Sequence, residues 1–136
     1  ILENSLSSDL LLPSRNGALE GAMSNIIDNA IEASSLPARI WIRIRESQNG
    51  IVLVEIEDRG CGIPANLESR LFQRGFSMGK SEGSGLGLYQ ANRTILEMGG
   101  EIRVLSRPGK GTRIQLYIPF IIPKLNPHPR EFSLQN

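Results

Sequence analysis

The spacing of apolar side chains along the chain predicts two long helices. Residues 17–35 place apolar positions three and four apart, as on one face of an amphipathic helix. A second helix with this spacing begins near Gly85 and stops at the pair Gly99-Gly100, a typical helix stop. Pro64 begins a shorter helix that is expected to run to Phe72. The apolar faces predicted for the long helices are Leu19, Ala22, Met23, Ile26, Ala30 and Ala33 on the first, and Leu88, Ala91, Ile95 and Leu96 on the second.

Four other segments are predicted as β-strands, two of which, 39–46 and 112–118, alternate apolar and polar residues with the period of a strand. They are residues 39–46, 51–58, 101–106 and 112–118. The dipeptide Asn49-Gly50 between the first two is a strong hairpin signal. Because the alternating strands carry their aliphatic residues on one face, the resulting sheet is expected to be covered on that face only. The predicted fold is therefore an α+β two-layer sandwich: a mixed, mostly antiparallel sheet with about three helices on one face.

Composition narrows the class of protein. The 136 residues correspond to about one domain. The 15 Lys and Arg residues against 14 Asp and Glu residues argue against a nucleic-acid-binding surface. No apolar run approaches the ~18 residues of a transmembrane helix, and a single cysteine excludes an internal disulfide and fits a reducing compartment. We expect an organised body over residues 1–118 and a flexible Pro-rich tail over 119–136, and the missing initiator Met indicates a piece of a longer protein.

Two polar residues occupy positions that the strand pattern assigns to the buried face. Asp58 continues the phase of Val52, Val54 and Ile56, and Thr112 shares the phase of the inward residues of its own strand. A buried carboxylate requires hydrogen-bond donors. The glycines that follow Asp58 allow the backbone to turn there and another group to approach closely. Asp58 is therefore a candidate acceptor for the amine of a base.

The two helices supply further candidate ligands. Asn25 and Asn29 are four residues apart and lie at the edge of the first apolar face. Amide oxygens are hard ligands that suit Mg²⁺. The second helix begins in the sequence SEGSGLGL, whose free backbone N–H groups form an anion site. Each of these features is common by itself, so the inference of a nucleotide site rests on their order and spacing together.

Two other phosphate-binding patterns fail. GFSMGKS is one residue too short between Gly75 and Gly79-Lys80 for a P-loop, and it follows a predicted helix rather than a strand. GSGLGL has Leu88 where the dinucleotide-binding pattern needs its third glycine.

Four motifs in order resemble the ATP-binding catalytic domain of sensor histidine kinases. SNIIDNAIEAS resembles the asparagine box, DRGCGIP the first glycine box, LFQRGF the phenylalanine box and GSGLGLY the second glycine box. The resemblance covers residues 15–118. It implies the Bergerat-type ATP-binding fold, which is shared with gyrase-type, heat-shock chaperone and mismatch-repair ATPases.

The resemblance also implies roles for individual residues. Asp58 would accept a hydrogen bond from the adenine amino group, with Thr112 assisting directly or through water. Asn29 would bind Mg²⁺, and Asn25 would lie at the phosphates. Residues 72–84 would form the lid over the nucleotide. The base would be lined by Gly60, Gly62 and Ile63, the phosphates would be held by Ser84, Gly85, Leu86, Gly87 and Leu88, and either Lys80 or Arg74 would reach the terminal phosphate.

Two positions depart from the wider family pattern. The water-activating ATPases carry a glutamate where this chain has Asn25, and an amide cannot act as a general base. The site therefore resembles one that holds ATP rather than one that hydrolyses it. Glu32 stands where many histidine kinases have lysine, which removes one phosphate contact.

The resemblance implies a histidine kinase that lacks its phosphoacceptor in this chain. The only histidine, His128, lies between two prolines of the tail and is expected to be inert. The γ-phosphate would pass to a histidine of a separate dimerisation and phosphoacceptor domain, with a response regulator downstream. A bacterial cytoplasmic location is expected for this domain, and the membrane attachment of the parent protein is left open. The alternatives are an anti-sigma-type protein serine kinase, a nucleotide-binding module without phosphotransfer, and an autonomous ATPase.

Overall fold

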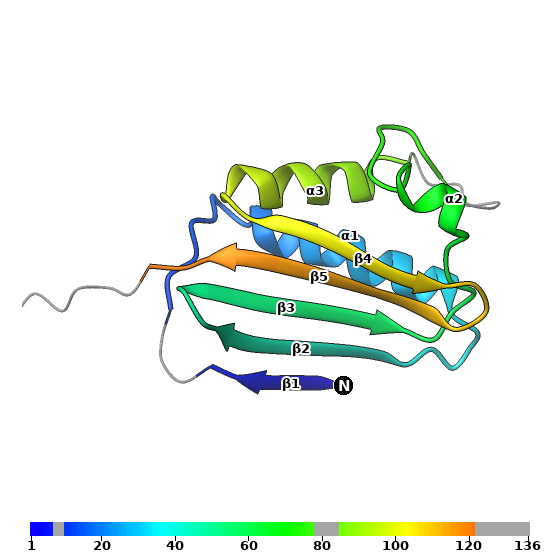
Figure 1. The fold of residues 1–136 in the computed structure, drawn as a ribbon, viewed down its shortest axis with the longest axis horizontal. Coiled ribbons are helices and arrows are strands. Elements are labelled where there is room, and N and C mark those ends of the chain that lie inside the picture. Colours follow the sequence, from blue (N-terminus) through cyan, green and yellow to red (C-terminus); the bar gives the residue numbers. More distant parts are fainter. Residues whose placement is uncertain (7–9, 78–84, 122–136) are drawn as a thin grey trace, which may run out of the picture.

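A five-stranded sheet with helices on one face forms the body of the protein. The computed structural model describes residues 1–6, 10–77 and 85–121. The strand order is β1-β2-β3-β5-β4, and only the β1–β2 pair is parallel (Figure 1). The strands are β1 (Leu2–Ser5), β2 (Ile40–Ser47), β3 (Ile51–Asp58), β4 (Glu101–Arg107) and β5 (Gly111–Pro119), and the helices are α1 (Ala18–Ala33), α2 (Ala65–Glu68) and α3 (Gly87–Glu97).

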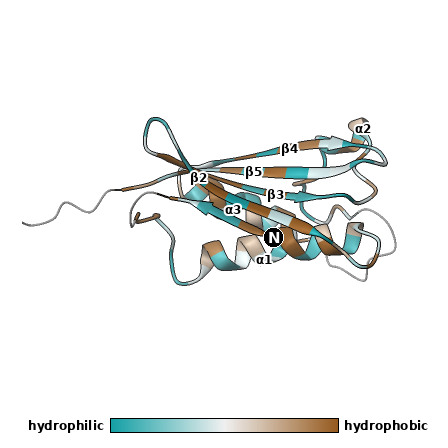
Figure 2. Cartoon of the chain, turned by 90° about the horizontal axis from the view of Figure 1, so that it is seen from below, coloured by the Kyte–Doolittle hydropathy of each residue, from teal (hydrophilic) through white to brown (hydrophobic). Residues whose placement is uncertain are grey.

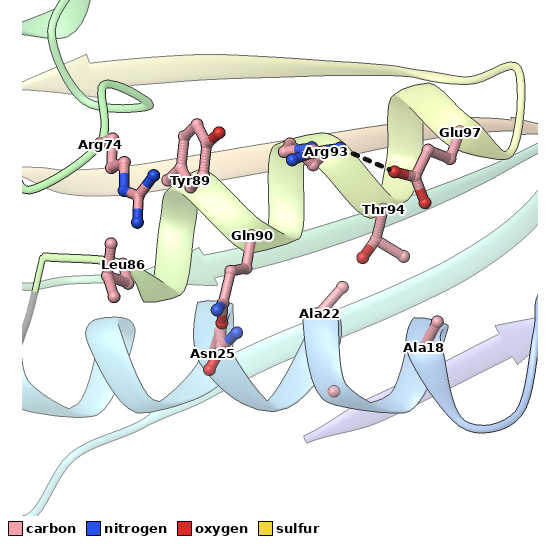
Figure 3. Close-up of a pocket in the computed structure, with 11 residues that line it drawn as sticks. Ala18, Ala22, Asn25, Arg74, Leu86, Tyr89, Gln90, Arg93, Thr94 and Glu97 are labelled. Carbon is pink, nitrogen blue, oxygen red and sulfur yellow. Dashed lines mark hydrogen bonds and ion pairs between the residues drawn. The ribbon is translucent and has the colours of Figure 1, made fainter.

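The predicted two-layer architecture is confirmed. Helices α1 and α3 lie side by side on one face of the sheet (Figures 1, 2 and 3). The short helix α2 contacts β4. The apolar stripes of α1 and α3 face the sheet because burying these stripes is the largest favourable contribution available to an amphipathic helix.

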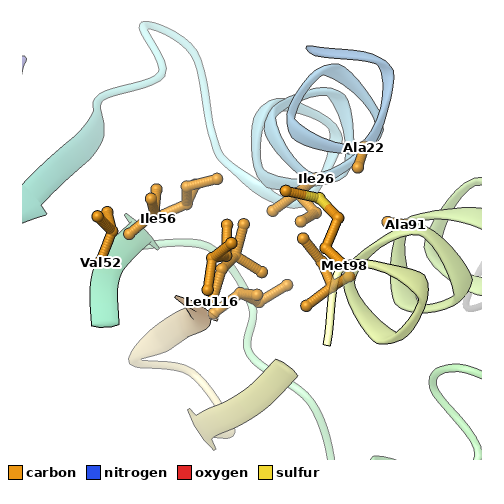
Figure 4. Close-up of a cluster of buried hydrophobic side chains, with 11 residues drawn as sticks. Ala22, Ile26, Val52, Ile56, Ala91, Met98 and Leu116 are labelled. Carbon is orange, nitrogen blue, oxygen red and sulfur yellow. The ribbon is translucent and has the colours of Figure 1, made fainter. Parts of the chain in front are cut away.

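The core lies between the two layers (Figure 4). Ile26 of α1, Ile95 of α3 and Leu116 of β5 belong to this core and are almost fully buried. The other buried members are Ala22, Val52, Val54, Ile56, Ala91, Met98, Ile114 and Ile118. The inward phase predicted for β3 and β5 is therefore confirmed.

Two local predictions need correction, and one strand was missed. Leu96, assigned to the apolar face of α3, is 56% exposed, and Met98 is buried instead because the helix ends at Glu97 and the chain turns back toward the sheet. The helix expected from Pro64 to Phe72 ends at Glu68 and continues only as turns. Strand β1 was not predicted, since its four residues are exposed and carry no alternation.

The uncovered face of the sheet also differs from expectation. Leu53 and Glu55 point to this face, yet they are only 6% and 3% exposed. Both lie on the central strand, where the long side chains of their cross-strand partners cover them. Arg45 pairs with Glu55 at 2.8 Å, and Gln115 donates a hydrogen bond to the same carboxylate at 2.9 Å. Polar side chains thus shield this face in place of a second helical layer.

The described fold continues past β5 to Ile121, which forms a backbone bridge with Leu11. The predicted tail lies outside the described residues from position 122 onward. Within the described part of the chain, every helix is too short or too polar to cross a membrane.

Candidate functional site

Asp58 is a buried carboxylate at the end of β3. Its side chain is 6% exposed and faces the helices, as the strand phase predicted. The Oδ1 atom accepts hydrogen bonds from the backbone N–H groups of Gly60, at 2.8 Å, and Thr112, at 3.2 Å. Among the described residues the hydrogen bonds of this carboxylate involve Oδ1 alone. Oδ2 is therefore the oxygen that remains for a ligand.

The environment of Asp58 shifts its proton affinity. Burial raises the pKa of this carboxyl above its ordinary value of 3.8, and the nearby Glu57 charge adds to the increase. The two backbone N–H groups oppose the shift because they stabilise the ionised form. A raised carboxyl pKa next to backbone donors is typical of a functional position rather than of a surface ion pair.

Asp58, Thr112 and Ser106 place polar side chains next to one another on β3, β5 and β4, and we call these three residues the polar row. Thr112 of β5 lies next to Asp58 across the β3–β5 boundary, and Ser106 of β4 is the ladder partner of Thr112. The two hydroxyl oxygens are 2.9 Å apart. Ser106 was missed by the sequence reasoning. Its signal was available, because it shares the inward phase of Ile102 and Val104 on β4.

The loop after Asp58 is fixed against two other elements. Cys61 donates its N–H to the carbonyl of Ala33 at the end of α1, and Ile63 donates its N–H to the Ser106 hydroxyl at 2.8 Å. Gly62 has a φ of +71°, and a Cβ there would overlap the carbonyl of Arg107. Glycine is therefore required at position 62 for both backbone conformation and space.

Helix α1 lies against this loop at its C-terminal end and against the start of α3 at its middle. Asn25 and Asn29 lie on it one turn apart and are both half-buried. Asn25 faces the first residue of α3 closely, since a Cβ on Gly87 would lie 3.5 Å from the Asn25 Cβ. From Asn25 to Ala33, where the Cys61 contact is made, the helix axis advances about 12 Å. The two asparagines thus lie between the Asp58 loop and the glycine-rich helix start.

A groove runs between α1 and α3 from this point (Figure 3). Asn25 of α1 and Gln90 of α3 extend toward each other across the groove. The small residues Ala18, Gly21 and Ala22 line its α1 side. Arg74 enters from the preceding loop and lies over the ring of Tyr89, 6.0 Å from its centroid. The lining residues are Ala18, Gly21, Ala22, Asn25, Arg74, Leu86, Tyr89, Gln90, Arg93, Thr94 and Glu97.

The segment predicted as a lid has a fixed base. Gly75 donates its N–H to the carbonyl of Gly85 at 3.1 Å. Gly85 has a φ of +65°, and a Cβ there would lie 2.6 Å from the Gly75 carbonyl carbon. Lys80 and Ser84, both predicted site residues, lie outside the described residues.

The described residues do not form a cluster of His, Cys, Asp and Glu that would hold a metal by themselves. Asn25 and Asn29 instead supply neutral amide oxygens. Mg²⁺ in phosphate-binding sites commonly uses one or two protein oxygens together with substrate phosphates and water. The donor set therefore fits a Mg²⁺ ion that arrives with a phosphorylated ligand.

Known proteins resemble this chain in both sequence and structure. The signal transduction histidine-protein kinase AtoS of Escherichia coli (strain K12) is 37% identical over 74% of this chain and 16% of its own length. The histidine protein kinase SaeS of Staphylococcus epidermidis (strain ATCC 35984) is 38% identical over 72% of the chain and 30% of its own. The structure of the mycobacterial sensor histidine kinase MprB superposes with a TM-score of 0.74 at 28% identity, covering 88% of this chain and 82% of that one.

These relations and the fold define an ATP-binding catalytic domain of the sensor histidine kinase type. The chain belongs to the family of histidine kinase-, DNA gyrase B- and HSP90-like ATPases, whose model matches residues 15–122. The chain spans about one sixth to one third of the curated relatives it matches.

Proposed function

We propose that this domain binds Mg-ATP and donates the γ-phosphate to a histidine on a separate helical domain. The observation that supports this most strongly is the buried Asp58 carboxylate, with Oδ1 held by two backbone N–H groups. A carboxylate in that position is ready to accept a hydrogen bond from an amino group through Oδ2. Because the hydrogen bonds to Oδ1 come from the backbone, the orientation of the acceptor is set before any ligand arrives.

The adenine base occupies the space beside Asp58 in this proposal. Its amino group donates to Oδ2, and Thr112 assists. Gly60, Gly62 and Ile63 line the base, and the contacts of this loop with α1 and Ser106 support its position. A guanine base would present an oxygen to the carboxylate and would be disfavoured.

The phosphates lie at the beginning of α3. Backbone N–H groups of Gly85, Leu86, Gly87 and Leu88, together with Ser84, are the proposed donors. The first N–H groups of a helix lack intrahelical partners, and the helix dipole favours negative charge there. The neighbouring Asn25 adds an amide side chain at the same position.

Asn29 is the proposed protein ligand of the Mg²⁺ ion, through its amide oxygen. The ion would neutralise phosphate charge that develops during transfer. The protein residues then position the nucleotide, and Arg74 or Lys80 contacts its terminal phosphate. Arg74 is supported by its place in the groove beside Leu86.

Asn25 is unable to activate a water molecule, because its side-chain amide is not basic. We therefore propose phosphotransfer rather than steady hydrolysis. The acceptor histidine would come from a dimerisation and phosphoacceptor domain of the same kinase, and a response regulator would act downstream. This chain would work in the bacterial cytoplasm. The histidine kinase relatives favour this function over a serine kinase or a binding module.

The test is calorimetric titration of the 136-residue chain with ATP and GTP, each with and without Mg²⁺. We expect ATP to bind more tightly than GTP and Mg²⁺ to strengthen ATP binding. Asn29→Ala should remove the Mg²⁺ effect and leave Mg²⁺-free binding unchanged. Ser24→Ala, at an exposed position of the same helix, is the matched control. Equal affinity for both nucleotides, or an unchanged Mg²⁺ effect in Asn29→Ala, would contradict the proposal.

A further inference from the structure

The hydroxyl of Ser106 makes three contacts at once. It accepts a hydrogen bond from the Ile63 N–H at 2.8 Å. It lies 3.1 Å from the carbonyl oxygen of Gly111, to which it is able only to donate. It also lies 2.9 Å from the Thr112 hydroxyl, where either oxygen is able to donate. Ser106 has one hydrogen for these three partners.

One assignment of hydrogens satisfies all three contacts. Ser106 donates to the Gly111 carbonyl and accepts from both Ile63 and Thr112. If Ser106 donated to Thr112 instead, its contact with Gly111 would bring two acceptor oxygens together without a hydrogen. The half-buried position of Ser106 favours the arrangement in which every polar atom is paired. The hydrogen of the Thr112 hydroxyl is therefore directed at Ser106.

This direction determines what Thr112 offers to a ligand. With its hydrogen bound to Ser106, the Thr112 oxygen has only lone pairs left and acts as an acceptor. Oδ2 of Asp58 is an acceptor as well, and the Thr112 N–H is already donated to Asp58 Oδ1. The polar row therefore presents two acceptors to the nucleotide site and no free side-chain donor of its own.

We propose that Ser106 is a positioning residue that sets base specificity by holding Thr112 as an acceptor. The inference rests on the proposed function, because it assumes that the base lies beside Asp58. The 6-amino group of adenine supplies two hydrogens for two acceptors, directly or through one water. A 6-oxo base supplies none at that position and places an oxygen against both acceptors. Discrimination thus comes from repulsion as well as from pairing.

The experiment compares ATP with inosine triphosphate, whose base carries a 6-oxo group in place of the 6-amino group. Binding of both to the 136-residue chain is measured by calorimetry. In Ser106→Ala the Thr112 hydrogen is released and becomes available to a 6-oxo group. We expect the ratio of ATP affinity to inosine triphosphate affinity to fall about tenfold. A merely structural role of Ser106 would weaken both nucleotides equally and leave the ratio unchanged.

A double-mutant cycle tests whether Ser106 acts on base selectivity through the Thr112 hydroxyl. Thr112→Val removes the hydroxyl itself and should lower the ratio. Adding Ser106→Ala to Thr112→Val should then change the ratio no further. Leu105→Ala, the neighbouring position on the opposite face of β4 and 54% exposed, is the control that should leave the ratio unchanged. Ser106→Cys, which keeps the side-chain size but bonds weakly, replaces Ser106→Ala if that variant does not fold.

The outcomes separate this inference from the proposed function. Selective ATP binding by the wild type with an unchanged ratio in the Ser106 variants would overturn the inference alone. A further fall of the ratio when Ser106→Ala is added to Thr112→Val would also overturn it. Failure of the wild-type chain to bind ATP would overturn the proposed function and the inference together.

Discussion

Gly87 of α3 faces Asn25 of α1 closely enough that a Cβ on Gly87 would lie in van der Waals contact with it, 3.6 Å from the Asn25 amide oxygen. This approach brings the middle of one helix to the first residue of another. It also shows that position 87 has room for a methyl group, since a distance of this size is ordinary van der Waals contact. The glycine is therefore not explained by packing in the ligand-free fold, and its role is expected to be in binding.

Gly87→Ala tests whether the glycine at position 87 is needed for nucleotide binding rather than for folding. The variant should be at least as stable as the wild type, because alanine favours helix by up to about 1 kcal/mol over glycine. ATP affinity should fall about tenfold or more, since the methyl group narrows the space proposed for the phosphates. Thermal unfolding and calorimetry measure the two effects. Gly85→Ala is the contrasting variant, and it should lose stability because its φ is positive and its Cβ would overlap Gly75.

Asp58→Asn should abolish nucleotide selectivity while stabilising the ligand-free fold. The pKa of Asp58 is raised in the folded state, mainly by burial, so the folded state holds the proton more tightly than the unfolded one. The corresponding stability is complete below pH 3.8 and is lost as the pH rises through the raised pKa. Asparagine avoids this loss, and its amide oxygen still accepts the two backbone N–H groups.

At pH 7 we expect the Asp58→Asn variant to melt at a higher temperature than the wild type, because the raised pKa of Asp58 makes its ionised form unfavourable in the folded state. The difference should close as the pH is lowered below 3.8, where Asp58 is protonated in both states. ATP affinity should fall at least about a hundredfold, because an amide N–H₂ would face the adenine amino group. Melting curves from pH 3 to pH 8 are the measurement, and a lower melting temperature at pH 7 would show that the carboxylate stabilises the fold.

Arg74→Ala tests which cation reaches the terminal phosphate. Arg74 lies in the α1–α3 groove near the start of α3. If it contacts the γ-phosphate, the variant should lose about fivefold in affinity for ATP and little for ADP. Arg93→Ala, a residue of the same groove that pairs with Glu97 at 3.3 Å, is the control. An unchanged ATP-to-ADP ratio in Arg74→Ala, with a reduced ratio in Lys80→Ala, would assign the contact to Lys80.

Glu55→Ala addresses the uncovered face of the sheet. The Glu55 carboxylate is buried between Arg45 at 2.8 Å and Gln115 at 2.9 Å. Removing it takes the shared acceptor from the half-buried Gln115 amide and the exposed Arg45 guanidinium and leaves a cavity on the central strand, and we expect a loss of about 2 kcal/mol in the free energy of unfolding. Urea denaturation measures this change. Glu101→Ala, which breaks an exposed pair with Arg103, should cost less than about 1 kcal/mol.

The sequence was sufficient to predict the elements whose periodicity reflects burial. The segment 51–58 matches β3 residue for residue, and the inward phase of Asp58 was correct because it follows from the alternation of a strand. Asn25 and the start of α3 were predicted separately, and the structure brings them close together.

Other features depend on information that a local pattern does not contain. The inward phase of Ser106 follows from the alternation of its strand, but its partner does not, because only the register of β4 and β5 places it beside Thr112. Glu55 lies on the face of the sheet that no helix covers, and its burial comes from long side chains on the two flanking strands. Strand β1 is short and exposed, so pairing with β2 defines it rather than its own composition.

The polar row that begins at Asp58 has a consequence for how the protein matures. Asp58 and Thr112 are 54 positions apart in the chain, so the carboxylate obtains its second backbone donor only after β5 has docked beside β3. A shift of that pairing by one residue would turn Thr112 to the opposite side of the sheet. A nucleotide that binds to the polar row would therefore bind only molecules in which β5 pairs with β3 in the native register. By mass action, this binding would stabilise those molecules against unfolding.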